Sequence, residues 1–382
     1  MRIRVRLPKV EPDVYDKPEQ CPYEECEGQH FKPHGTQGER KVIRDLEYQV
    51  VTSLRMRCLR CKRTFRVYPR GVSNAQQSDR LKAMTVLLYV LGLSYGVVSD
   101  FTSALGQEVS KTTTYNNTQE AGKQARKRQR ATVKRGGKRP VIGADGTYVK
   151  VKGEYVGIEV VVDDESGELL GLDIIVSENS EEVLEIIRKV VEDVDAEVIV
   201  SDGHGAYTEV VNELGLEHQI CRSHAKRNMD GLAKSIREQL KKKEALPKGV
   251  DSSPQRLEQD LKDLQKLIRE RPEDGSERLE KLYYRYKAAP VPKKGQRQTV
   301  WYRSRMLITR TWNRWPCLTL DQRRDDLDGT NNTSERLIGW WIKERYRTMR
   351  GYKRPKSIKH VVTLTARMGV RSGHYDMAEL YM

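Results

Sequence analysis

The chain of 382 residues lacks the long hydrophobic run that a membrane-spanning helix needs. Such a helix takes about 18 or more consecutive apolar residues, and the best run here, residues 83–93, is far shorter. Residues 1–8 alternate arginine with apolar residues and lack the apolar core of a secretory signal. We therefore expect no membrane partner, no secretion, and a cytoplasmic protein kept in a reducing compartment.

Cysteine and phenylalanine are also scarce, and acidic residues are outnumbered by basic ones. There are 6 Cys, and 3 Phe stand against 18 Tyr and 5 Trp, while 54 Asp and Glu face 70 Lys and Arg for a net charge of +16. Tyrosine and tryptophan suit stacking on bases, and a positive excess favours a nucleic-acid partner over a small-molecule substrate. A merely basic soluble protein is the alternative. Apolar stretches between residues 141 and 221 exclude disorder throughout.

The few cysteines are grouped. One pair has the spacing C-x4-C, the other C-x2-C, and residues 42–57 between them are rich in β-forming residues. Such spacing predicts a zinc ribbon with a closed, structural Zn²⁺ site. Four unrelated reduced cysteines are the alternative, and His30 or His34 could replace one ligand. The predicted ligands are Cys21, Cys26, Cys58 and Cys61.

Three polar residues that cap helices follow the ribbon. Ser78 precedes an apolar helix that ends at Gly92, Ser94 opens a short second helix, and Ser110 opens a polar, basic third helix. This order predicts a helix-turn-helix whose last helix reads DNA, although a plain three-helix packing module would look similar. A basic block without acids, residues 121–139, follows and could track phosphates. The DNA-binding candidates here are Lys111, Thr113, Asn116, Asn117, Arg126, Lys127, Arg128 and Arg130.

From residue 141 the pattern is that of an α/β protein. Three apolar segments separated by short turns predict an antiparallel meander over residues 141–178. Residues 180–194 have helical apolar spacing, and residues 196–201 form a short apolar strand that implies a buried, parallel position. A further helix is expected beyond Gly205. The order strand, strand, strand, helix, strand, helix is that of an RNase H-like core, and the Lys-, Glu- and Leu-rich residues 225–328 predict a helical insertion.

Acidic residues stand at the ends of two strands predicted to be neighbours. Asp145 lies in the first strand and Asp202 ends the fourth. Like charges so close together are costly unless a cation lies between them, and Mg²⁺ or Mn²⁺ prefers such oxygen ligands. Glu335 is the expected third carboxylate, in the first turn of a helix capped by Thr333 or Ser334. Its competitors are Asp325, Asp326 and Asp328.

These acids, with a helical insertion between the last two, resemble those of the DDE transposases of bacterial and archaeal insertion sequences. The strings VSDGHGAY, CRSHAKRN and NNTSERLIGWWIKERYRTMRGYKR are similar to those of insertion-sequence enzymes with a Cys-x2-His motif, a feature shared with Mutator-like elements. The resemblance covers residues 141–355. It implies that Asp145 and Asp202 bind two Mg²⁺ or Mn²⁺ ions jointly and that Glu335 holds the second.

The resemblance also implies a reaction. Water attacks the phosphodiester at each end of the element, and the freed 3′-hydroxyl attacks target DNA without a covalent protein intermediate. The motif residues Cys221 and His224 would lie close to the active site, with an auxiliary role or a purely structural one. His204 is a weaker candidate of the same kind. A basic, aromatic stripe after Glu335 is suited to terminal DNA: Lys343, Arg345, Arg347, Arg350 and Lys353.

The sequence thus predicts a transposase that binds the terminal inverted repeats of its element and cuts and joins double-stranded DNA at those ends and at a target. Pairing two ends implies a homodimer or a larger homo-oligomer, associated with the nucleoid through DNA. The alternatives are a catalytically inactive DNA-binding regulator and an RNase H-like nuclease or resolvase. The expected parts are a zinc ribbon (1–75), a helix-turn-helix (76–120), a basic linker (121–140), the core (141–224), the helical insertion (225–328) and C-terminal core helices (329–382).

Overall fold

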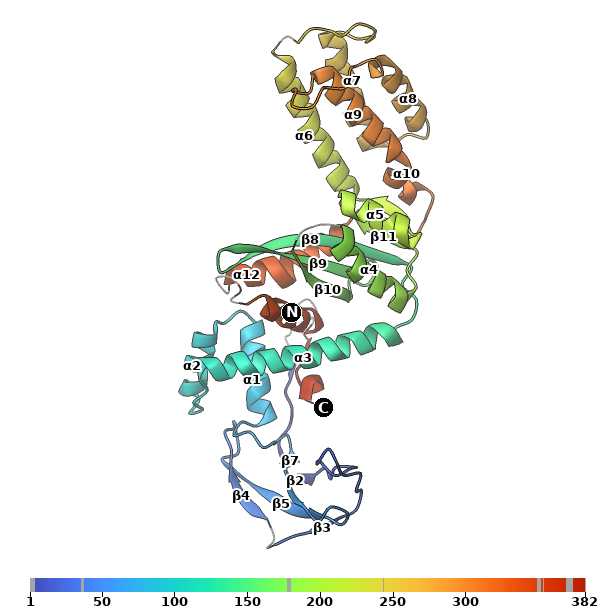
Figure 1. The fold of residues 1–382 in the computed structure, drawn as a ribbon. Coiled ribbons are helices and arrows are strands. Elements are labelled where there is room, and N and C mark those ends of the chain that lie inside the picture. Colours follow the sequence, from blue (N-terminus) through green and yellow to red (C-terminus); the bar gives the residue numbers. More distant parts are fainter. Residues whose placement is uncertain are drawn as a thin grey trace. The chain divides into compact units, whose positions relative to one another are not determined.

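The computed structural model describes most of the chain and divides it into two compact units (Figure 1). Unit 1 comprises Met1–Thr132, Val149–Tyr155 and Gly339–Met382, and unit 2 comprises Val133–Tyr148 and Val156–Ile338. Each unit is described by itself. The described residues are 4–35, 38–176, 180–242, 244–348, 352, 354–368 and 374–381.

Short strands form the N-terminal part of unit 1. The long strand β5 pairs antiparallel with β3, β4 and β6, and the turn at Cys58 and Cys61 brings β6 back onto it. Strands β2 and β7 pair antiparallel, and β1 pairs parallel with the C-terminal β13. The strands are β1 (Arg4–Arg6), β2 (Glu11–Tyr15), β3 (Phe31–Pro33), β4 (Glu39–Val42), β5 (Val50–Cys58), β6 (Thr64–Val67), β7 (Pro69–Arg70) and β13 (His374–Asp376).

The three helices predicted after these strands are present: α1 (Asp79–Val90), α2 (Tyr95–Ala104) and α3 (Lys111–Arg135). The hydroxyls of Ser78 and Ser94 accept the N–H groups of Leu81 and Val97, which explains where α1 and α2 begin. Residues 121–135, expected as a basic linker, form the second half of α3. A cluster of buried residues from α1, α3 and the C-terminal α13 (Pro355–Arg367) is the core of this part.

Unit 2 is built on a mixed five-stranded sheet with the order β10-β9-β8-β11-β12. Strands β9 and β10 are antiparallel, whereas β11 is parallel to both β8 and β12, as expected for a strand reached through a crossover helix. Apolar faces of the helices pack on the sheet in one core. The elements are β8 (Val141–Val151), β9 (Glu154–Asp163), β10 (Leu169–Ile175), α4 (Ser180–Val194), β11 (Val198–Ser201), α5 (Gly205–Leu214) and β12 (Glu217–Ile220).

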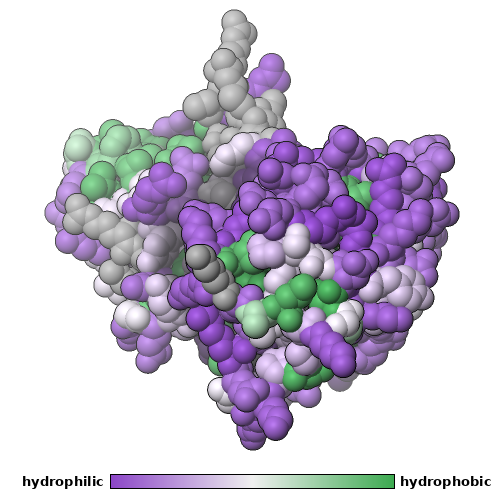
Figure 2. All heavy atoms as spheres, turned by 90° about the horizontal axis from the view of Figure 1, so that it is seen from above, coloured by the Kyte–Doolittle hydropathy of each residue, from purple (hydrophilic) through white to green (hydrophobic). Residues whose placement is uncertain are grey.

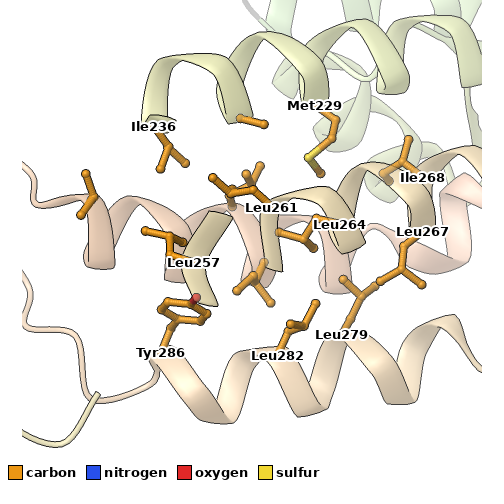
Figure 3. Packing of buried hydrophobic residues seen from close by; sticks show 14 of the residues in the cluster. Met229, Ile236, Leu257, Leu261, Leu264, Leu267, Ile268, Leu279, Leu282 and Tyr286 are labelled. Carbon is orange, nitrogen blue, oxygen red and sulfur yellow. The ribbon is translucent and has the colours of Figure 1, made fainter. Parts of the chain in front are cut away.

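A helical segment follows β12, as the sequence predicted. Leucines at helical spacing on α7 meet apolar residues of α6 and α8, and they form a second core in unit 2 (Figure 3). Trp301 and Trp315 belong to this core and are 0% and 6% exposed. The helices are α6 (Arg222–Leu240), α7 (Pro254–Glu270), α8 (Gly275–Tyr286), α9 (Val300–Asn313), α10 (Trp315–Leu318) and the 3-10 turn η1 (Leu320–Gln322).

The chain then runs through α11 (Asn332–Ile338), the π-helix η2 (Gly339–Glu344), α12 (Arg345–Thr348), α13 and the 3-10 turn η3 (Ala378–Tyr381). A π-helix inside a helical run is uncommon and frequent at functional sites. The face in Figure 2 is mainly hydrophilic with small hydrophobic patches. In the described part of the chain, no helix has the length and apolar character to cross a membrane.

Candidate active site

The acids of the two parallel strands lie at the same level of the sheet. Val198 and Val200 of β11 pair with Val141 and Gly143 of β8. Asp145 is two residues beyond Gly143, and Asp202 is two residues beyond Val200. Side chains alternate along a strand, so this register brings both carboxylates to one face of the sheet, at the end of β11. The backbone N–H of His204 donates to Asp202 Oδ1 over 2.8 Å and orients that carboxylate.

The negative charges of both acids affect the pKa of a buried tyrosine. Tyr207 of α5 is 4% exposed, and its hydroxyl donates to Glu159 of β9 at 2.9 Å from Oε1 and 3.2 Å from Oε2. Burial raises the pKa of Tyr207 well above its ordinary value, and the negative charges of Glu159, Asp145 and Asp202 raise it further. The acids therefore share one electrostatic neighbourhood. Sequence reasoning missed Glu159, whose only signal is a single charge within the apolar segment GIEVVV.

Glu335 is held against the same strand by the start of its helix. The backbone N–H of Glu335 donates to the carbonyl of Asn331 over 3.1 Å. Asn331 is therefore the residue directly before α11, and its carbonyl accepts the first hydrogen bond of the helix. The expectation that Thr333 or Ser334 caps this helix is wrong, although Glu335 does lie in the first turn. The side chain of Asn331 does not cap the helix: its Oδ1 accepts no hydrogen bond, and its Nδ2 donates to the carbonyl of Ala144, 3.0 Å away. This bond fixes α11 to β8 directly beside Asp145.

Cys221 and His224 meet Glu335. Cys221 Sγ, a ring nitrogen of His224 and a carboxylate oxygen of Glu335 all lie within 4.8 Å of one another. His224 Nδ1 is 3.1 Å from Glu335 Oε1, yet both atoms are buried and without an aligned hydrogen-bond partner. The backbone N–H of Asn331 donates to Cys221 Sγ over 3.2 Å. The loop before α11 therefore contacts both the Cys-x2-His motif and β8.

Cys221 and His224 shift each other's pKa. Burial raises the pKa of the Cys221 thiol, but hydrogen bonds from the His224 side chain and from nearby backbone N–H groups outweigh it and lower the pKa overall. The hydrogen bond to Cys221 raises the pKa of His224 against the effect of burial, and the charges of Glu335 and Asp202 add to the rise. The charges of Glu335 and Asp202 thus both reach His224.

Cationic side chains border the acids. A pocket of about 310 Å³ beside Asp202 is lined by Arg310 and Arg314 and by apolar residues of α6, α7 and α9. Burial lowers the pKa of Arg314, the charge of Arg310 lowers it further, and Asp202 opposes this. Two arginines next to a carboxylate can neutralise a phosphate bound there. The sequence gave no signal for them, because only the packing of the helical segment brings them to Asp202.

Among the competing acids, Asp325 is exposed, whereas Asp326 and Asp328 have partners elsewhere. Asp326 pairs with Arg324 at 2.8 Å, and both oxygens of Asp328 accept the Thr330 hydroxyl. His204 precedes α5, where its ring Nδ1 accepts the N–H of Ala206 over 3.4 Å. These contacts give the residues local roles at helix and turn ends.

The four cysteines of the predicted ribbon come together. Cys21 Sγ lies 3.8 Å from Cys61 Sγ, and Cys26 Sγ lies 3.8 Å from Cys58 Sγ. All four sulfurs are within 4.8 Å of one another, whereas His30 and His34 lie outside this cluster in the described residues. The backbone N–H of Arg63 lowers the pKa of Cys61 to about 6, which favours the thiolate. The cluster has the ligands of a closed, tetrahedral zinc site.

The predicted DNA-contact residues have different surroundings. On α3, Lys111, Asn116, Lys127 and Arg130 are exposed, and Thr113, Arg126 and Arg128 are half-buried. Asn117 instead donates to Gln77 and Thr85 inside unit 1.

After α11, Lys343 and Arg347 are exposed, whereas Arg345 is 4% exposed and lies over the Tyr89 ring at 4.2 Å. Arg345 is thus used in packing and is not accessible to DNA in this structure. Arg350 and Lys353 lie outside the described residues.

Fold and site together define a mixed α/β protein whose carboxylates gather beside β8, where the parallel strand β11 ends. The model of the IS66 transposase family matches residues 76–347, more than half of the chain. The chain therefore belongs to the IS66 transposase family. No curated protein matches it significantly. Among solved structures, the magnesium-bound HTLV-2 integrase catalytic core domain (trimeric form) matches with 17% identity over 34% of this chain and 84% of that chain, at a TM-score of 0.20.

Proposed function

We propose that this protein is a DDE-type DNA transposase with an RNase H-like core, and that Asp145, Asp202 and Glu335 are its catalytic acids. The observation that carries the proposal is the register of β8 and β11, which puts the two aspartates at one level, together with the Asn331 bond that fixes the helix of Glu335 to β8. Membership of a transposase family supports the same reaction class.

The residues of the site fit divalent metal ions. Three carboxylates offer the oxygen ligands that Mg²⁺ and Mn²⁺ prefer, and Glu335 Oε1 is buried without a hydrogen-bond partner. Asp145 and Asp202 would hold two ions jointly, with Glu335 on the second. When bound, such ions activate the attacking hydroxyl and stabilise the leaving oxygen.

The chain's own groups orient these acids and bind the substrate. The N–H of His204 fixes Asp202, and the buried Tyr207, which donates to Glu159, lies within reach of the charges of Asp145 and Asp202. Arg310 and Arg314 would neutralise the DNA backbone beside Asp202. The reaction proposed is hydrolysis at an element end followed by attack of the freed 3′-hydroxyl on target DNA.

The parts of unit 1 would recognise the element ends. The four-cysteine cluster would bind a structural Zn²⁺, and α1 to α3 would act as a helix-turn-helix with the exposed basic residues of α3 along the phosphates. The exposed Lys343 and Arg347 would add contacts to terminal DNA. Double-stranded DNA is thus the proposed partner, held by a homodimer or larger homo-oligomer that pairs two ends.

The deciding experiment uses labelled candidate end DNA with Mg²⁺ and scores binding, nicking and joining together. We expect Asp145→Asn, Asp202→Asn and Glu335→Gln each to lower nicking about 100-fold or more while binding persists, since each removes charge stabilisation in the transition state. Glu209→Gln, on the exposed side of α5, is the matched control and should keep full activity.

Two alternatives give different results in this assay. An inactive regulator would bind end DNA without nicking it under any metal condition. A nuclease or resolvase would nick but would not join a pre-cut end to target DNA. Nicking that survived all three substitutions would refute the catalytic assignment.

A further inference from the structure

The Cys-x2-His motif provides two of the four ligands that a tetrahedral metal site needs. The fold brings a third candidate ligand, Glu335, next to them. Cys221 precedes α6 and His224 lies in its first turn, whereas Glu335 comes from α11 far along the chain. Their ligand atoms converge within 4.8 Å of one another. Among these atoms, His224 Nδ1 and Glu335 Oε1 are buried, face each other at 3.1 Å, and lack an aligned hydrogen bond.

We propose that Cys221, His224 and Glu335 form a second metal site that binds one thiophilic divalent ion of the Zn²⁺ class, separate from the four-cysteine site. Zinc bonds of about 2.3 Å to sulfur and about 2.0–2.2 Å to nitrogen and oxygen place tetrahedral ligands roughly 3.4–3.7 Å apart. The distance of 3.1 Å between His224 and Glu335 already lies near this range. Small side-chain movements would complete the site.

The chemistry of the donors selects the ion. A thiolate and an imidazole are borderline-soft ligands that suit zinc and other late transition metals, whereas Mg²⁺ prefers oxygen alone. Three protein ligands leave a fourth position for water or another small ligand, as in open zinc sites. The side chains of His224 and Glu335 are 17% and 33% exposed, but their facing atoms Nδ1 and Oε1 are buried, as is Cys221, so a bound ion would be largely shielded from solvent.

Glu335 would then belong to two sites. A carboxylate that ligates Zn²⁺ beside Cys221 is withdrawn from the acids of β8 and β11, where the proposed function needs it. Occupation of the second site should therefore inhibit strand cleavage. This consequence rests on the proposed function, whereas metal binding by the three residues does not.

Metal counting tests the binding itself. The protein purified with Zn²⁺ in its four-cysteine cluster is titrated with Co²⁺, and absorption from cobalt–thiolate charge transfer and d–d bands is recorded. We expect one further equivalent of Co²⁺ to bind with these bands and to be displaced by Zn²⁺. Cys221→Ser should remove the thiolate band, and His224→Gln should weaken binding about 10- to 100-fold or more.

Cys317→Ser is the matched control, because Cys317 is another free cysteine outside both clusters. It should bind the further equivalent as the unmodified protein does. The proposal is overturned if the zinc-loaded protein takes up no further ion at micromolar concentrations, or if Cys221→Ser leaves the spectrum unchanged. The first of these results is read from the unmodified chain, so the test holds even where a variant folds poorly.

The inhibitory consequence has its own readout. In Mg²⁺, micromolar Zn²⁺ should suppress nicking by the unmodified protein, and the concentration for half-inhibition should rise about tenfold or more in His224→Gln. If no nicking occurs under any condition, the proposed function fails and the metal count stands on its own. If zinc binds but does not inhibit, the shared role of Glu335 is wrong.

Discussion

Asp164 is a buried acid whose protonation should control stability. It follows β9, and its Oδ1 is buried without a hydrogen-bond partner. Burial, together with the negative charges of Asp328 and Asp163, raises the pKa of Asp164 to about 7. At neutral pH and above, the folded state must therefore hold a poorly solvated charge next to two like charges.

This arrangement predicts a pH-dependent gain from Asp164→Asn. The folded-state pKa lies above the unfolded-state value, so the free energy of unfolding falls as the pH rises from about 4 to about 7 and then levels off. We expect the variant to be about 4 kcal/mol more stable at pH 8.5 but only about 2 kcal/mol more stable at pH 5.5, since one pKa unit corresponds to about 1.4 kcal/mol and about half of the pKa rise lies above pH 5.5. Urea unfolding at both pH values measures the difference, and Asp173→Asn on β10 is the control. An equal effect at both pH values would contradict the assignment.

Site residues that strand order brings together could be predicted from the sequence, whereas those that tertiary packing brings together could not. Asp145 and Asp202 were recognisable because strand order alone makes their strands neighbours. Their catalytic roles stay predictions. Arg314 and Glu159 gave no usable signal, because the first reaches Asp202 only through the packing of a helical segment and the second resembles any charge in a strand. Contacts between residues far apart in the sequence depend on side-chain packing, and local sequence patterns do not predict that packing.

At the scale of elements, the contact between β8 and α11 depends on Gly143. A Cβ added at Gly143 would lie 2.4 Å from Ser334 Oγ and 3.1 Å from Asn331 Oδ1. Ser334 is fully buried and its hydroxyl has no hydrogen-bond partner. The glycine thus permits the first turn of α11, and with it Glu335, to lie directly on the strand that carries Asp145.

This contact predicts a compensating pair of substitutions. Gly143→Ala should destabilise the protein by about 1–3 kcal/mol through overpacking and should lower nicking because Glu335 is displaced. Ser334→Ala should be nearly neutral, since it removes an unpaired buried hydroxyl. The double variant should recover much of both losses, measured by chemical unfolding and by the nicking assay. Additive losses in the double variant would show that this contact does not position Glu335.

Elements were more predictable than their ends. The helices that begin near Ser78, Ser94 and Ser110 were expected from capping residues, and the meander and crossover strand from apolar patterning. The start of α11 was misplaced because Thr333 and Ser334 resemble capping residues, whereas the carbonyl of Asn331 accepts the first helical bond and its side chain is engaged with β8. A tertiary contact therefore outweighed the local capping preference.

At the scale of the whole molecule, the two units are stabilised differently. Unit 2 contains two extended hydrophobic cores, one on the sheet and one among α6 to α10. The N-terminal strands of unit 1 have only small apolar clusters, one around Val10 and Val51 and one around the cysteines. Short strands with so little buried apolar surface need a metal or another crosslink to be stable.

Removal of zinc should consequently unfold the N-terminal strands and leave unit 2 intact. A strong thiol-competitive chelator, or Cys58→Ser, removes a site whose binding energy is also folding energy. In hydrogen exchange we expect amides of β3 to β6 to lose protection, while those of β8, β11 and α7 keep it. Cys317→Ser should behave like the unmodified protein, because that sulfur lies outside the cluster. Unchanged protection in β5 after complete zinc removal would mean that the four cysteines do not hold a structural metal, and loss of protection throughout would mean that the two units unfold as one.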